Sequence, residues 1–200
     1  MKKIFALLIL TLLNINLFYS QNNKTKKADR LFERLEFVKA SEEYLKILDN
    51  SPDNNYVIRK LADSYYNIFN TVEAEKWYSK LSNNDSDPEV YYRYSQMLKA
   101  NGKYKESMKW MTKFSEMMPY DSRAIAFRNT PNYIDKIVEK GEKFNIQNLD
   151  INSEYSDFGS TIFNNKLYFT SSRNEKRKSY GWNNEPFLDI YSSFINDKGT

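Results

Sequence analysis

The side chains that could perform chemistry are few and of limited kinds. Two carboxylate pairs, Glu42 with Glu43 and Glu73 with Glu75, are of the residue type that glycosidases use as acid and base. That reaction needs two carboxylates facing each other across a cleft, whereas both pairs lie on predicted helix exteriors. The chain has no His and no Cys, which excludes Cys/His zinc sites, Ser-His-Asp triads and Cys-His dyads. We therefore predict no catalytic residue, no metal site and no cofactor.

Charge and glycine content exclude two further classes of function. With five Gly in 200 residues, no glycine-rich phosphate loop is present. The formal net charge of +4 is too small to indicate nucleic acid, and no basic stripe with interleaved aromatic residues accompanies it. The basic run Lys176-Arg177-Lys178 could contact an anionic lipid or glycan, but a solvated loop is the simpler interpretation. Binding to other proteins is the function class that remains.

The elements that would position binding residues repeat along the chain. Four sets of residues share one register: Ala40, Ala74 and Ser107; Tyr44, Tyr78 and Met111; Ile47, Leu81 and Phe114; and Pro52, Pro88 and Pro119. The first set recurs after 34 and then 33 residues. Spacings of three and four residues within each unit predict two amphipathic helices, and Gly102 fits the turn between them. This pattern resembles the tetratricopeptide repeat family, apart from Ser95 and Ser107 where Gly or Ala is usual.

The resemblance implies that the first helix of each hairpin lines a concave groove. Mixed charge with Tyr suits peptide recognition, because Tyr offers rigid area and a hydrogen-bonding tip. Asp63 would repel a C-terminal carboxylate, so we do not expect the Lys/Asn carboxylate clamp that some arrays use. The alternative is that these side chains are only surface, or dock onto the following domain. The predicted groove residues are Arg59, Asp63, Tyr66 and Asn67 from the second unit, and Tyr92, Gln96 and Lys99 from the third.

The segments before and after the repeats have different compositions. Residues 1–20 combine a positive start, an apolar run from Ile4 to Leu13 and the sequence Phe18-Tyr19-Ser20 before Gln21, which predicts a signal peptide cut after Ser20. The apolar run is too short for a membrane anchor. Residues 21–140 form the predicted repeat domain, in which 121–140 cap the third repeat.

At Gly141 the hydrophobic period changes from 3.6 to 2. Two β-rich runs, Ser160–Phe163 and Lys166–Thr170, flank Asn164-Asn165, which suits a two-residue hairpin turn. A third predicted strand covers Phe187–Phe194. The motifs Ser-Asp-Phe-Gly at 156–159, Leu-Tyr-Phe-Thr-Ser-Ser-Arg at 167–173 and Asp-Ile-Tyr at 189–191 resemble the first blade of a WD40-like (PD40, TolB-type) β-propeller. A generic small sheet is the alternative, and the predicted strands are too few for a blade, so we expect the native chain to continue past Thr200.

Together these features predict an α+β multidomain protein: an α-helical tetratricopeptide-repeat solenoid followed by an incomplete β-propeller blade, residues 141–200. The order resembles the N-terminal part of OmpA-family, PorE-like envelope proteins of Bacteroidota. That resemblance implies a non-enzymatic scaffold, exported to the periplasm and associated with the outer membrane, with partners among outer-membrane or type IX secretion and gliding components. Peptidoglycan would be bound only through a domain absent from this chain. The alternative is a secreted or periplasmic hydrolase whose catalytic part lies beyond residue 200.

Overall fold

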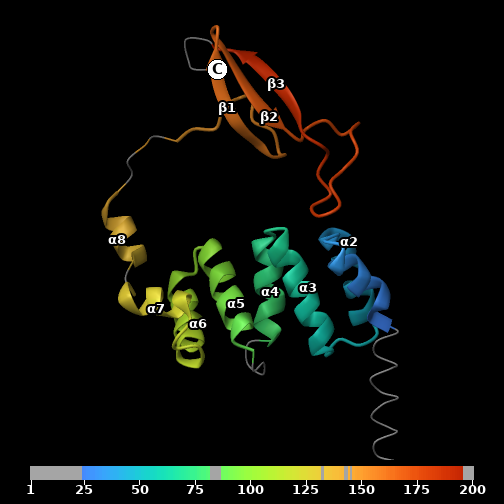
Figure 1. The fold of residues 1–200 in the computed structure, drawn as a ribbon, viewed down its shortest axis with the longest axis vertical. Helices are drawn as coiled ribbons and strands as arrows, with labels where there is room; N and C mark the ends of the chain where they lie inside the picture. Colours follow the sequence, from blue (N-terminus) through green and yellow to red (C-terminus); the bar gives the residue numbers. More distant parts are fainter. Residues whose placement is uncertain (1–23, 82–86, 132, 142–143, 145, 196–200) are drawn as a thin grey trace, which may run out of the picture. The chain divides into compact units, whose positions relative to one another are not determined.

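The computed structural model describes residues 24–81, 87–131, 133–141, 144 and 146–195. The predicted signal peptide lies outside these residues. The chain divides into two compact units, Met1–Pro131 and Asn132–Thr200. A helical segment over 24–33 is followed by helices α2 (Phe37–Leu48), α3 (Asn55–Asn67), α4 (Thr71–Leu81), α5 (Pro88–Ala100), α6 (Tyr104–Met117), α7 (Ser122–Asn129) and α8 (Tyr133–Glu139), and then by strands β1 (Asp157–Phe163), β2 (Lys166–Ser171) and β3 (Asp189–Phe194) (Figure 1). None of the described helices is long and apolar enough to cross a bilayer.

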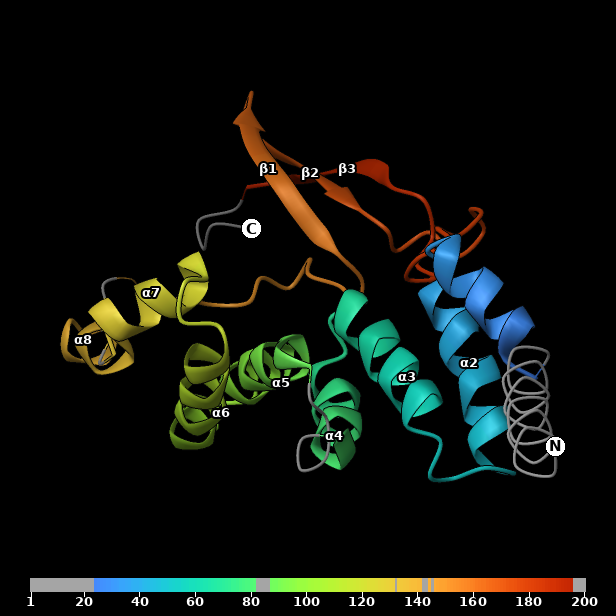
Figure 2. The ribbon, with the colours of Figure 1, turned by 60° about the horizontal axis from the view of Figure 1, so that its bottom comes forward.

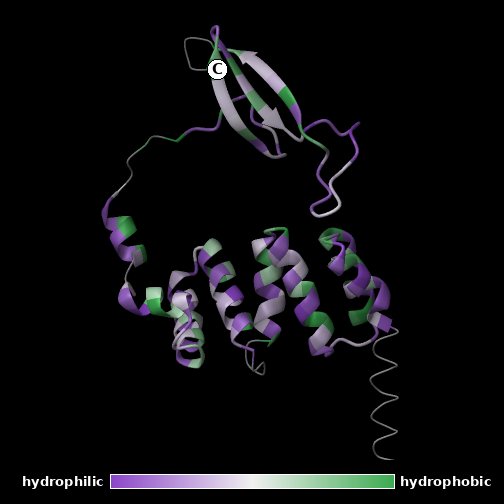
Figure 3. Ribbon diagram, in the orientation of Figure 1, coloured by the Kyte–Doolittle hydropathy of each residue, from purple (hydrophilic) through white to green (hydrophobic). Residues whose placement is uncertain are grey.

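The helices of the first unit pack as successive antiparallel hairpins. The segment 24–33 pairs with α2, α3 with α4, and α5 with α6, and the helices α2 to α7 stand side by side in chain order (Figures 1 and 2). Green and purple alternate along them in Figure 3, as expected for helices that bury one face. This arrangement confirms the predicted helical-hairpin repeat.

Helices α3, α5 and α7 each begin after a residue whose side chain caps the helix. Asn54, Asp87 and Asp121, which are 33 and 34 residues apart, each accept a hydrogen bond from a backbone N–H in the first turn. Such caps satisfy donors that the helix itself leaves unpaired. Pro88, which shares the register of Pro52 and Pro119, is the first residue of α5, where its fixed φ suits a helix start.

The core of the repeats consists of the small and aromatic residues predicted from the register. Ala40, Ala74, Tyr44 and Tyr78 are fully buried. Ser107, at the position of the two alanines, is also buried, and its hydroxyl donates to the Ser95 carbonyl at 2.7 Å. A serine is tolerated there because its polar atom has a partner on the adjacent helix.

The predicted cap of the third repeat divides into two different helices. Helix α7 packs on α6 and buries Ala124 against Phe114. Helix α8 has no buried residue and belongs to the second unit. A capping role for α8 therefore stays a prediction, and its Ile137 and Val138 are exposed.

The second unit contains one antiparallel sheet with the order β1-β2-β3. Asn164 and Asn165 have φ of 47° and 57°, which confirms the predicted two-residue turn between β1 and β2. The register shifts between Phe158 and Thr161, next to Gly159 at φ 66°, as in a β-bulge. The described residues form three strands and no fourth, so the propeller stays a prediction.

The motif residues that carried the propeller resemblance hold this sheet together. Arg173 donates to Asp157 at 2.8 Å and to the Ile151 carbonyl at 2.8 Å. Its guanidinium lies over the rings of Phe169 and Tyr191, at 5.0 and 5.1 Å. Desolvation alone would raise the pKa of Asp157, but hydrogen bonds from Ser171, Arg173 and Ser153 outweigh it and hold this pKa well below its usual range.

Candidate peptide-binding surface

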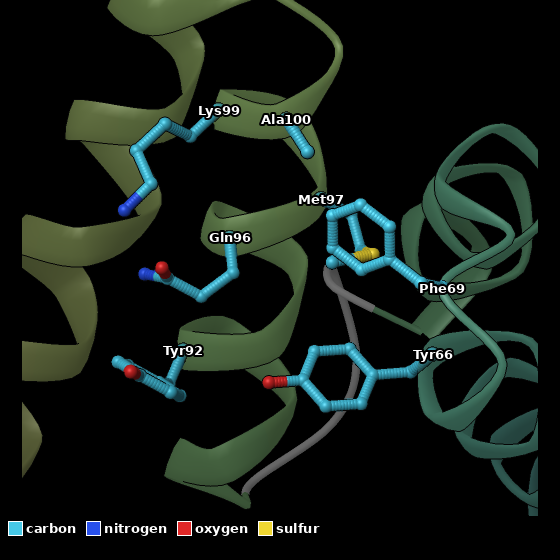
Figure 4. A pocket seen from close by; sticks show the side chains of 7 residues that line it. All are labelled: Tyr66, Phe69, Tyr92, Gln96, Met97, Lys99 and Ala100. Atoms are coloured by element: carbon cyan, nitrogen blue, oxygen red, sulfur yellow. The ribbon is translucent and has the colours of Figure 1, made fainter. Parts of the chain in front are cut away.

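The candidate site is a pocket of about 330 Å³ on the first helices of two successive hairpins. Its lining residues come from the end of α3, the turn after it and one side of α5: Tyr66, Phe69, Tyr92, Gln96, Met97, Lys99 and Ala100 (Figure 4). Figure 4 shows the Lys99 ammonium, the Gln96 amide and the Tyr92 hydroxyl on one side, and the Phe69 ring beside Met97 on the other. The pocket therefore has a polar side and an apolar side.

Four of the seven predicted groove residues, Tyr66, Tyr92, Gln96 and Lys99, line this pocket together. The two tyrosine rings are held by their neighbours. The ring of Tyr66 meets that of Tyr78 edge-on at 6.3 Å, and burial raises the pKa of the Tyr66 hydroxyl. The ring of Tyr92 packs against Phe114 at 5.2 Å. Pre-set aromatic walls of this kind reduce the entropy lost on binding.

Asp63, in contrast, is part of the fold and does not line the pocket. Its Oδ1 accepts from the hydroxyl of the buried Tyr78 at 2.5 Å and from Arg93 Nη1 at 2.8 Å. The same contact occurs one repeat earlier, where Tyr44 donates to Asp29 at 2.7 Å. The effect of Asp63 on a ligand carboxylate stays a prediction, and Arg93 partly offsets the charge of Asp63.

Arg59 and Asn67 also engage partners within the repeat unit. Arg59 forms an ion pair with Asp87, the cap of α5, and so joins two successive first helices. The exposed Asn67 donates its side-chain amide to the Asp63 carbonyl at 2.7 Å, within its own helix. Neither residue lines the pocket. Of the seven predicted groove residues, four thus line the pocket. The other three, Arg59, Asp63 and Asn67, make contacts within and between the helices.

Two arginines that the sequence analysis did not select complete this surface. Arg93 lies over the Tyr66 ring at 5.1 Å and pairs with both Asp63 and Glu89. Arg123 of α7 lies over the Tyr92 ring at 4.1 Å and pairs with Glu89 at 3.0 Å. Each guanidinium thus packs on the ring of one tyrosine that lines the pocket. A signal for Arg93 was present, because it occupies the position of Arg59 one period later.

The chemistry available at the pocket is that of binding. Its polar groups can all donate hydrogen bonds, from one ammonium, one amide and two phenol hydroxyls, and none of its lining residues is acidic. Across the described part of the chain, no group of three or more acidic residues is placed to hold a metal ion. The arrangement can accept an apolar side chain together with groups that accept hydrogen bonds.

No protein-family model and no curated protein matches the sequence, so the resemblance to OmpA-family envelope proteins stays a prediction. A solved structure titled as the first TPR of Spaghetti (RPAP3) bound to HSP90 peptide SRMEEVD is 22% identical, covers 60% of this chain and 94% of that one, and has a TM-score of 0.47. The NMR structure of the first TPR domain of human RPAP3 is 20% identical over the same shares, with a TM-score of 0.49. Both of these similar structures are tetratricopeptide domains.

Proposed function

We propose that this chain is a non-enzymatic scaffold that binds a peptide segment of a partner protein at the pocket on α3 and α5. The observation that carries the proposal is the convergence of Tyr66, Tyr92, Gln96 and Lys99, from two successive hairpins, around one partly apolar pocket. Repeat arrays present such surfaces along their first helices, and a peptide lying across them would contact several repeats at once.

The rigidity of the pocket walls supports this proposal. Tyr66 contacts both Tyr78 and Arg93, and Tyr92 contacts both Phe114 and Arg123. Aromatic anchors held in one orientation are typical of residues that contribute most to protein interfaces. The ion pairs behind them link α3, α5 and α7, so that a ligand would meet a preformed surface.

Site-specific cross-linking tests the proposal. A photoreactive amino acid replaces Gln96 in the pocket, and in a matched control it replaces Lys109, an exposed residue of the second helix α6. We expect one discrete cross-linked partner from position 96 in cells that express the chain, and none from position 109. Equal products from both positions, or none from 96, would contradict binding at the pocket.

For the cellular setting, we propose an exported scaffold in the periplasm, associated with the outer membrane and with type IX secretion or gliding components. The proposal rests on the signal-peptide pattern of residues 1–20 and on the order of repeats and β-rich segment. Contact with peptidoglycan would need a domain that is not present in these 200 residues. Fractionation of native cells tests this: a product larger than 23.8 kDa that stays with peptidoglycan sacculi is expected, whereas a cytosolic product would contradict it.

A further inference from the structure

The loop that joins β2 to β3, residues 172–188, is long but is ordered by its own contacts. It extends beyond the ends of both strands (Figure 1). Connections longer than about 12–15 residues are uncommon and are usually functional or disordered. In this loop the backbone N–H of Phe187 donates to the Lys178 carbonyl at 2.7 Å, and that of Tyr180 donates to the Glu185 carbonyl at 2.8 Å. The end of the loop is therefore a closed turn, which favours a functional role over disorder.

Side-chain contacts also hold this turn in place. The Glu185 carboxylate accepts a hydrogen bond at 2.8 Å from the hydroxyl of the buried Ser172, where the loop leaves β2. The rings of Tyr180 and Phe187 pack together with their centroids 4.6 Å apart. Because these groups already fix the turn, a side chain presented at its tip would lose little entropy on meeting a partner.

The tip of the turn presents Trp182, which is 46% exposed. Among the described residues, its ring has no aromatic or cationic neighbour and its indole N–H has no acceptor. Trp combines a large apolar ring with one hydrogen-bond donor, and it is enriched where an apolar phase meets water. An exposed Trp on an ordered turn is therefore suited to such a boundary.

Two exposed lysines, Lys176 and Lys178, lie on the same loop. In the part of the chain that the structure describes, neither ammonium has a carboxylate within ion-pair distance. Arg177 between them does pair, with Asp189 at 3.4 Å, and the neighbouring Glu175 accepts from a tyrosine hydroxyl at 2.6 Å. The loop thus presents two unpaired positive charges together with an exposed tryptophan.

We propose that this loop docks on a bilayer surface that contains anionic phospholipid, with Trp182 entering the headgroup region and Lys176 and Lys178 contacting phosphate groups. The lysines supply the charge complementarity, and the indole suits the boundary between headgroups and acyl chains. This surface belongs to the second unit and is separate from the peptide pocket.

An anionic polysaccharide would attract the same lysines, but the loop fits it less well. Sugar hydroxyls need free hydrogen-bond acceptors beside the aromatic ring. The acceptors next to Trp182 are already used within the turn, since Asn183 Oδ1 accepts from the Glu185 N–H at 3.1 Å and the Glu185 carboxylate accepts from Ser172. The bilayer surface is therefore the partner that the contacts favour.

Vesicle binding measured at Trp182 tests the proposal. The full chain is mixed with vesicles of phosphatidylglycerol and phosphatidylcholine whose acyl chains are brominated near the headgroup. The difference in quenching between the unaltered chain and Trp182→Phe separates the signal of Trp182 from those of Trp77 and Trp110. Because bromine quenches only at short range, adsorption through another part of the chain leaves this signal unchanged. We expect quenching with the mixed vesicles and little with phosphatidylcholine alone.

Single charge changes assign the lysines. Lys176→Gln and Lys178→Gln should each weaken vesicle binding about fivefold, as for one lysine at an anionic surface. Lys166→Gln is the matched control, because it removes the same charge at the other end of β2. That position is about 17 Å away along the strand, so screening should keep its effect below about twofold. Urea unfolding followed by Trp182 fluorescence checks that each variant keeps its sheet.

Each alternative result contradicts a definite part of the proposal. Equal weakening by Lys166→Gln and by the two loop variants would indicate adsorption by net charge and overturn the role of the loop. Equal quenching with and without phosphatidylglycerol would overturn the anionic lipid. If soluble polygalacturonate changes the Trp182 fluorescence while brominated vesicles do not quench it, the partner is a polysaccharide and the bilayer is refuted.

Discussion

Replacing Asp63 with alanine distinguishes a structural carboxylate from a ligand-binding one. The change removes the acceptor of the Tyr78 hydroxyl at 2.5 Å and the partner of Arg93 at 2.8 Å. Tyr78 is 0% exposed, so water cannot replace the lost acceptor without opening the core. We therefore expect Asp63→Ala to unfold more readily than the parent chain.

The expected magnitude follows from the two lost contacts. A hydrogen bond to a charged group contributes about 1.5–3 kcal/mol, and here its loss leaves the O–H of the buried Tyr78 without its carboxylate acceptor. The Arg93 side chain is 30% exposed and still pairs with Glu89 at 3.3 Å. Losing its ion pair with Asp63 therefore adds only about 1 kcal/mol. Together these give a loss of about 3 kcal/mol in the free energy of unfolding. Asp63→Asn should lose about 1 kcal/mol, because an amide oxygen still accepts from Tyr78.

Urea unfolding followed by circular dichroism at 222 nm, which reports the helical unit, measures these losses. Asp53→Ala is the control, because Asp53 is an exposed aspartate whose loss should cost less than about 0.5 kcal/mol. Tyr78→Phe completes a double-mutant cycle with Asp63→Ala, and we expect a coupling of about 1 kcal/mol or more. If Asp63→Ala is as stable as Asp53→Ala, the contact with Tyr78 has no structural role, and Asp63 returns to the set of ligand-binding candidates.

Three further predictions concern pH, a turn and a helix contact. The folded-state pKa of Asp157 lies below its unfolded value of about 3.9, so the stability that the Asp157 carboxylate contributes is complete above that pH and is lost as the pH falls further. Trp182 fluorescence should report this loss of stability, and Asp157→Asn should abolish the pH dependence. Asn165 has φ of 57°, so Asn165→Val should lower the free energy of unfolding of the sheet by about 1–2 kcal/mol, whereas Asn165→Gly should not, by the same fluorescence signal. Ser107→Leu should overpack the buried contact between α5 and α6 and cost about 1–3 kcal/mol in urea unfolding, while Ser107→Ala should cost about 1 kcal/mol for its lost hydrogen bond.

The helical hairpins could be predicted because their signals are local and recur. Small residues at Ala40, Ala74 and Ser107 mark where two helices approach, and the structure buries all three. The Asn164-Asn165 turn is likewise readable, since few residues tolerate positive φ at two successive positions. In each case one short stretch of sequence contains the physical cause of the conformation.

The role of Asp63 could not be obtained in the same way. Its partners lie 15 and 30 residues away, and the ion pair with Arg93 depends on how two successive hairpins stack. A surface position in a helical register does not distinguish a carboxylate that faces solvent from one that satisfies a buried tyrosine. The repeat itself contained a partial signal, because Asp29 with Tyr44 and Asp63 with Tyr78 have the same separation. A pairing that recurs with the period favours a structural role over a ligand-specific one.

The turns of the hairpins show how a repeat can free one position for binding. Leu35, Phe69 and Gly102 adopt the same left-handed conformation and make the same two backbone hydrogen bonds, although only one is glycine. Helix packing on either side of the turn therefore sets the backbone, and the residue type decides only how much strain is stored there. Glycine would minimise that strain at all three turns. Leu35 and Phe69 both depart from this optimum and are both exposed, and of the two it is Phe69 that lines the pocket.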